Sequence, residues 1–136
     1  MTIAVLDASV VLKWFGDEDK RHPDPARALR LAFAAGELVV LAPPLLFLEI
    51  INVAGRRWRW TDQALRELAH ALDQLGFEVQ EPDIERVAFW VGRGLTAYDA
   101  AYVTVAETQG VPLVTDDRLI LQTAAGIALP PGAIVH

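Results

Sequence analysis

The sequence contains no cysteine, which excludes disulfide bonds, thiol nucleophiles and thiolate metal sites. Histidine is also scarce, and the three that occur, at positions 22, 70 and 136, are widely spaced. A zinc site, which depends on cysteine and histidine ligands, is therefore not expected. The lack of cysteine agrees with a cytoplasmic location, which is the location we expect.

Long apolar runs and an excess of basic residues are missing as well. Although 53% of the residues are hydrophobic, no uninterrupted apolar run approaches the roughly 20 residues of a membrane-spanning helix, so no membrane association is expected. Acidic residues outnumber basic ones, 18 to 12, and the net charge is -6. That balance argues against a general nucleic-acid coat protein, which neutralises phosphates with lysine and arginine. It leaves open an acidic site that meets phosphate through metal ions.

Predicted strands and helices alternate along the chain. Short apolar runs predict strands at residues 2–6, 38–41, 77–79, 111–115 and 133–135. Helices are predicted from a turn at 7–9, where Asp7 or Ser9 would provide the cap, to about 15, then over 26–35, 45–59, 62–75, 83–93, 97–109 and from 118 to about 125. The alternation predicts one α/β domain over residues 1–136, with a central parallel sheet covered by helices on both faces.

Four acidic residues are placed where this fold would bring them together. Asp7 and Asp117 follow predicted strands, at the carboxyl edge where open α/β sheets bind ligands. Glu49 interrupts the apolar stretch PPLLFLEIINVAG, and Asp99 lies in the first turn of a helix whose small residues allow close packing on the sheet. Carboxylates gathered at one site repel each other unless a cation compensates, and oxygen ligands suit Mg²⁺ or Mn²⁺.

Each acid, taken alone, also has a purely structural interpretation. Glu49 could pair with an arginine, because a helix over 45–59 would place three polar residues on its face, namely Asn52, Arg56 and Arg59. Asp99 could cap its helix. Asp116 and Asp117 could form a turn and a cap in the same way.

The order of the motifs is more specific than any one of them. DASV follows the first strand, Glu49 lies on a helix that begins after two prolines with Asn52 three residues later, TAYDAAY precedes the penultimate strand, and LVTDD ends at Asp117. Together, over Ile3 to Val135, these motifs resemble the PIN-domain family, and most closely its VapC-type toxin ribonucleases. The resemblance implies a three-layer α/β/α domain whose acids bind Mg²⁺ or Mn²⁺ and cleave RNA. It also implies a homodimer and a cognate antitoxin protein.

The resemblance also implies roles for individual residues. Asp7, Glu49 and Asp99 match the family's catalytic, metal-binding acids. The fourth acid of the family follows a threonine after one intervening residue, which selects Asp117 and leaves Asp116 as a neighbour that could assist the metal. Small polar residues expected to support the acids are Ser9, Asn52 and Thr115.

One basic and aromatic cluster, residues 56–60, has two interpretations. Stacking of Trp58 and Trp60 on RNA bases, with phosphates neutralised by Arg56 and Arg59, is one of them. A protein interface, where tryptophan and arginine are also enriched, is the other, and we favour it with the antitoxin as the partner.

Three other interpretations of the whole chain fit the sequence less well. A haloacid-dehalogenase-like phosphatase needs a second aspartate two residues after the first, where this chain has Ser9. A receiver domain needs a lysine after a late strand, where this chain offers Arg118. A catalytically idle PIN-like interaction module would not need all four acids, which would destabilise a fold that did not use them.

Overall fold

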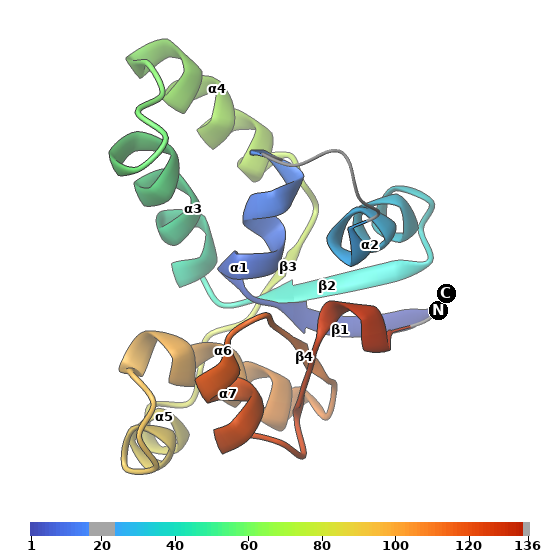
Figure 1. The fold of residues 1–136 in the computed structure, drawn as a ribbon, viewed down its shortest axis with the longest axis vertical. Coiled ribbons are helices and arrows are strands. Elements are labelled where there is room, and N and C mark those ends of the chain that lie inside the picture. Colours follow the sequence, from blue (N-terminus) through green and yellow to red (C-terminus); the bar gives the residue numbers. More distant parts are fainter. Residues whose placement is uncertain (17–23, 135–136) are drawn as a thin grey trace.

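The computed structural model describes residues 1–16 and 24–134 and shows a three-layer α/β/α arrangement (Figure 1). The sheet has five strands in the order β3-β2-β1-β4-β5, and every pair is parallel. The strands are β1 (Thr2–Leu6), β2 (Leu38–Ala42), β3 (Glu78–Val79), β4 (Leu113–Val114) and β5 (Ala128–Leu129). The prediction of a central parallel sheet is confirmed.

Helices cover both faces of the sheet, as the alternation of elements predicts. They are α1 (Ala8–Val11) with a following 3-10 turn (Leu12–Trp14), α2 (Pro25–Ala34), α3 (Leu45–Arg56), α4 (Asp62–Asp73), α5 (Ile84–Val91), α6 (Ala97–Gln109) and α7 (Arg118–Thr123). Figure 1 shows α1 to α4 on one side of β1 and β2, and α5 to α7 on the other side. Among the described residues, no helix is both long and apolar enough to cross a bilayer.

Helix α6 is the central helix of its layer. It packs against β1, β2 and β4, and every residue from Ala100 to Ala106 is buried. Small side chains allow this close approach, and the helix has defined ends. The Thr96 hydroxyl accepts a hydrogen bond from the Asp99 N–H at 3.1 Å at the amino end, and Gly110 takes a left-handed φ of 67° at the carboxyl end.

The structure corrects two predicted elements. The last strand is Ala128–Leu129, paired with β4, and not 133–135, because Pro131–Ala133 forms a 3-10 turn that begins with a proline. Val135 lies outside the described residues. Helix α3 ends at Arg56, and Arg59 has a left-handed φ of 56°, so Arg59 does not share a helical face with Glu49.

Candidate active site

The acids identified in the sequence come together at the carboxyl edge of the sheet. Asp7 follows β1, and Asp117 follows β4, which pairs with β1. Helices α3 and α6 bring Glu49 and Asp99 to the same place from the two opposite layers. Their charges act on one another: the charges of Asp99 and Asp7 raise the pKa of Glu49, and the charge of Asp117 raises the pKa of Asp99.

Asp7 is the most buried of these acids, with 5% of its surface exposed. Its carboxylate accepts a hydrogen bond from the Ser9 hydroxyl at 2.5 Å on one oxygen and another from the Thr115 hydroxyl on the other oxygen. Burial raises the pKa of Asp7 from 3.8 to about 6; the two hydroxyl groups lower it and the charge of Asp116 raises it. Asp7 is the N-cap residue of α1, as one of the two expected alternatives had it, but its side chain makes no capping hydrogen bond.

Glu49 is half-buried on α3 and is held by a tyrosine, not by an arginine. The Tyr102 hydroxyl, on α6, donates a hydrogen bond to Glu49 Oε2 at 2.9 Å. Burial raises the pKa of Glu49, and the negative charges of Asp99 and Asp7 raise it further, while the Tyr102 hydrogen bond lowers it. Within the described part of the chain, the structural alternative of an arginine pair for Glu49 therefore finds no support.

Asp99 is half-buried in the first turn of α6, but it does not cap that helix. Its backbone N–H is the group that is capped, by Thr96. Burial raises the pKa of Asp99, and the charge of Asp117 adds to the rise. Thr96, and not Asp99, is therefore the N-cap residue of α6. The Asp99 carboxylate lies in the first turn, where a side-chain hydrogen bond with Thr96 lowers its pKa.

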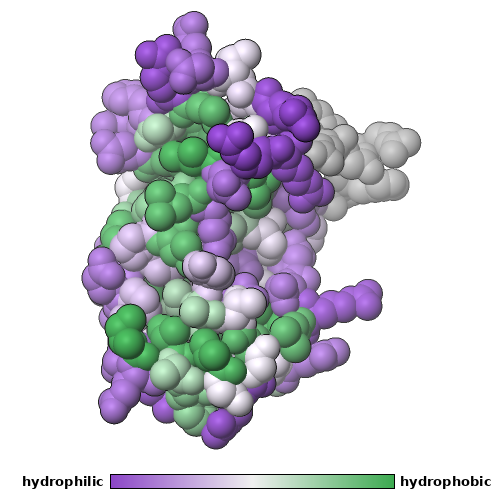
Figure 2. All heavy atoms as spheres, turned by 90° about the vertical axis from the view of Figure 1, so that its left-hand side faces the viewer, coloured by the Kyte–Doolittle hydropathy of each residue, from purple (hydrophilic) through white to green (hydrophobic). Residues whose placement is uncertain are grey.

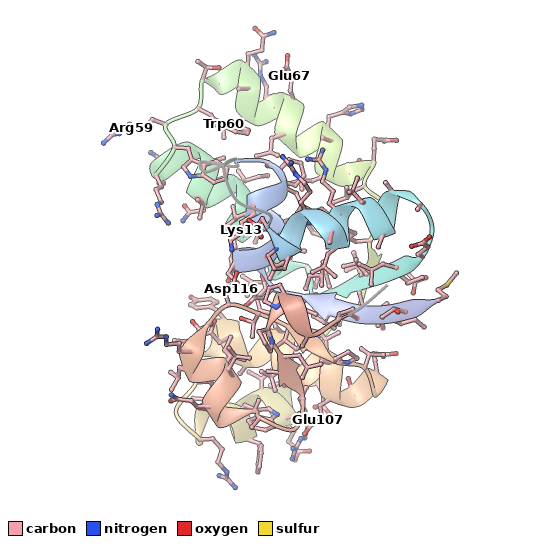
Figure 3. The ribbon with its side chains drawn as sticks, turned by 45° about the vertical axis from the view of Figure 1, so that its right-hand side comes forward. Lys13, Arg59, Trp60, Glu67, Glu107 and Asp116 are labelled. Atoms are coloured by element: carbon pink, nitrogen blue, oxygen red, sulfur yellow. The ribbon has the colours of Figure 1, made fainter. Side chains whose placement is uncertain are left out.

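The two adjacent aspartates after β4 differ in their partners. Asp117 caps α7, accepting from the Ile120 N–H at 2.9 Å, and its own N–H donates to the Thr115 hydroxyl at 3.0 Å. Asp116 forms an exposed ion pair with Lys13, at 3.0 Å between Nζ and Oδ2 (Figure 3). Asp116 thus has a competing cationic partner, whereas one oxygen of Asp117 remains outside its capping bond.

The chemistry of these side chains fits a hard divalent cation. Carboxylate oxygens are the ligands that Mg²⁺ and Mn²⁺ prefer. Burial, and after it repulsion from neighbouring acids, raises the pKa values of Asp7, Glu49 and Asp99, and a cation would offset both effects. Over residues 1–16 and 24–134, no three acidic or histidine side chains stand close enough to form a ready-made metal cluster. Mg²⁺ that keeps several water ligands needs only one or two protein carboxylates. Asp7, Glu49 and Asp99 are the residues from which those carboxylates would come.

A groove of about 670 Å³ begins at this site and runs along α3. Glu49, Ser9 and Asn52 line the end at the acids, and Lys13, Arg57 and Trp58 also line it. Trp58 packs so closely on Gly16 that a Cβ there would lie 2.4 Å from its ring. The cluster at residues 56–60 therefore borders the groove. The rings of Trp58 and Trp60 are tilted by 39° at 5.5 Å between their centroids.

Sequence reasoning missed two residues of the site, Tyr102 and Lys13. Tyr102 lies three positions after Asp99, so helical spacing could have placed both on one face of α6. Lys13 pairs with a residue 103 positions away, and no local pattern in the sequence announces that contact.

Comparisons with known proteins match this architecture. The model of the PIN domain family matches residues 4–126. A curated relative, exonuclease VapC9 of Pyrobaculum aerophilum, is 52% identical over 90 residues, which cover 60% of this chain and 67% of the relative.

Solved structures give the same assignment of the fold. PAE2754 from Pyrobaculum aerophilum superposes with a TM-score of 0.66 at 27% identity, covering 97% of this chain and 92% of that one. VapC20 from Mycobacterium tuberculosis, titled a sarcin-ricin loop cleaving toxin, gives 0.66 at 19% identity, with coverages of 90% and 94%. A toxin-antitoxin complex from Klebsiella pneumoniae gives 0.60 at 18%, with coverages of 94% and 97%. The chain therefore belongs to the PIN-domain family of nucleases, whose members generally use divalent metal ions.

Proposed function

We propose that this chain is a Mg²⁺- or Mn²⁺-dependent endoribonuclease, the toxin of a toxin-antitoxin pair, built as a single PIN domain over residues 1–136 and located in the cytoplasm. One observation carries the proposal: Asp7, Glu49 and Asp99 converge from three elements, and burial, with repulsion from neighbouring acids, raises their pKa values. Asp117 is the fourth acid, and Asp116 lies beside it.

The residues of the site have different roles in phosphodiester hydrolysis. A bound divalent ion supplies the polarisation of the phosphate and the acidity of a water molecule that this reaction needs. Asp7, Glu49 and Asp99 would hold the ion, while Ser9 and Thr115 fix the Asp7 carboxylate. Attack of water on phosphorus breaks the P–O3′ bond, so one fragment carries a 5′-phosphate and the other a 3′-hydroxyl.

The names of the relatives differ on where cleavage occurs. VapC9 is named an exonuclease, whereas VapC20 is titled a toxin that cleaves the sarcin-ricin loop. A circular single-stranded RNA separates the two modes, because only an endonuclease can open a circle. We expect the purified protein to open the circle in Mn²⁺ and to remain inactive in EDTA.

Total cellular RNA gives the substrate and the end chemistry in the same assay. New ends mapped by sequencing should carry 5′-phosphates, and Asp99→Asn should lower the cleavage rate by about 100-fold or more. Shortening of linear RNA with intact circles would make the enzyme an exonuclease. Full cleavage in EDTA would reject the metal-dependent mechanism, and no cleavage under any condition would reject the nuclease.

An antitoxin partner is supported by the titles of structural neighbours, which include the Klebsiella pneumoniae toxin-antitoxin complex. We propose that the cluster formed by Arg56, Trp58, Arg59 and Trp60 contacts this partner and that a basic side chain of the antitoxin enters the acidic site, forming charge-assisted pairs. Co-purification of the product of the neighbouring gene tests the partner directly.

A homodimer is the third part of the proposal. Figure 2 shows apolar side chains gathered on the face that carries α3 and α5, and Leu48, Ile84 and Val91 are exposed by 68%, 77% and 43%. Apolar patches of this kind mark interfaces more often than free surface. Sedimentation of the wild type and of Leu48→Glu distinguishes a dimer from a monomer.

A further inference from the structure

Tyr102 joins the two helices that carry the acids of opposite layers. It lies on α6 with 1% of its surface exposed, and its hydroxyl donates to Glu49 Oε2 on α3 at 2.9 Å. Asp99 lies three residues earlier on the same helix. Helix α6 therefore supplies one acid of the site and also the donor that holds a second acid.

Core packing alone accounts for the ring of Tyr102 but not for its hydroxyl. A phenylalanine would fill nearly the same space, and burying a hydroxyl is unfavourable unless it finds a partner. The partner here is a half-buried carboxylate whose other neighbours include Asp7 and Asp99, both acidic. A neutral donor at this position fixes Glu49 without cancelling its charge.

We infer that Tyr102 is a positioning residue that holds Glu49 by one oxygen and leaves the other oxygen directed to the divalent cation. The inference rests on the proposed function, because it assigns the freed oxygen to that cation. A side chain with three rotatable bonds loses freedom when one oxygen is anchored, so the cation meets a pre-oriented ligand. Tyr102 itself does not touch the ion.

Tyr102→Phe tests this role, since it removes one oxygen atom and keeps the ring. Calorimetric titration with Mn²⁺ should show an affinity roughly 10-fold or more below that of the wild type, the usual cost of losing a supporting hydrogen bond to a metal ligand. The chain has one other tyrosine, Tyr98, which is 63% exposed. Tyr98→Phe is the matched control and should bind Mn²⁺ as the wild type does.

A double-mutant cycle shows whether the effect passes through Glu49. In a Glu49→Gln background, Tyr102→Phe should cause little further loss of Mn²⁺ affinity, because the ligand that it positions is already neutral. An equal loss in both backgrounds, or no loss in the wild-type background, would overturn the inference. Thermal unfolding of the metal-free variants establishes that each compared protein is folded.

A second measurement does not depend on how well Tyr102→Phe folds. In the Tyr98→Phe protein Tyr102 is the sole tyrosine, so its ring carbon resonances can be followed by ¹³C NMR during addition of Mg²⁺. The resonances should shift, and the shift should be absent in Tyr98→Phe/Glu49→Gln. If the resonances do not shift in a protein that binds Mg²⁺, the inference is wrong while the proposed function stands. A wild type that neither binds Mn²⁺ nor cleaves RNA would overturn the proposed function and this inference with it.

Discussion

Neutralising Asp7 should stabilise the metal-free protein at neutral pH while abolishing its proposed activity. Folding raises the pKa of Asp7 from 3.8 to about 6, and about 1.4 kcal/mol corresponds to each unit, so ionising this buried carboxylate costs the fold about 3 kcal/mol. Because the pKa of Asp7 is higher in the folded protein than in the unfolded one, the cost is absent below about pH 4, where the carboxyl is protonated in both states. The wild type therefore loses about 3 kcal/mol of unfolding free energy as the pH rises through 6. Asp7→Asn cannot ionise and should not show this loss.

The pH dependence is a cleaner measure than the absolute difference. Ser9 and Thr115 both donate to the carboxylate, and an amide can accept on one side only, which costs the variant some stability at every pH. The difference in unfolding free energy between Asp7→Asn and the wild type should therefore shift by about 3 kcal/mol in favour of the variant between pH 4 and pH 8.

Urea unfolding in EDTA, followed by tryptophan fluorescence across this pH range, measures the difference. Asp73→Asn, at the exposed end of α4, is the control and should follow the wild type. Saturating Mn²⁺ should reverse the order, because only the wild type gains stability from binding the ion. Parallel pH profiles for Asp7→Asn and the wild type would refute the reasoning that burial raises the pKa of Asp7.

Three further predictions concern the neighbours of the site. Asp117→Asn should weaken Mn²⁺ binding by roughly 10-fold, and by more than Asp116→Asn does, although asparagine can still cap α7. Calorimetric titration of both variants measures the two losses, and a reversed order would make Asp116 the fourth acid. Trp58→Ala or Trp60→Ala should weaken antitoxin binding by about 30-fold, as truncated hot-spot tryptophans do, with RNA cleavage retained; lost cleavage at unchanged partner affinity would favour base stacking. Lys13→Met should raise the pH midpoint of Asp7 by up to roughly half a unit, because it removes the cation paired with Asp116, whose charge raises the pKa of Asp7. Lys13→Arg keeps the cation and should not; the same urea titration across pH measures both variants.

The sequence predicted the elements whose ends carry local signals. Helix α6 was predicted with the observed bounds because Thr96 caps one end and Gly110 terminates the other. The alternation of strands and helices was sufficient for the parallel sheet. The predicted strand at 133–135 failed because apolar residues after two prolines look like a strand, whereas the chain had already paired with β4 at Ala128.

Side-chain partners were much harder to predict than elements. Glu49 and Tyr102 are 53 positions apart, and Lys13 and Asp116 are 103 apart. Such contacts form only when the layers of the fold pack together, so the periodicity of residues along one helix does not predict them. Convergence of the acids could be predicted because parallel strands end at one edge, but the donors that hold them could not.

The choice of those donors separates the site from an ordinary acidic surface. Glu107 lies away from the site (Figure 3). It accepts two hydrogen bonds from Arg86, both at 2.8 Å, and Arg86 lowers the pKa of Glu107. Asp7 and Glu49, by contrast, are held in the described structure by the hydroxyl groups of Ser9, Thr115 and Tyr102. A neutral hydroxyl orients a carboxylate but leaves its charge unpaired. An idle structural module would gain nothing from keeping an unpaired buried charge. The negative charge thus stays available at the carboxyl edge of the sheet, where a divalent cation is the partner that would offset it.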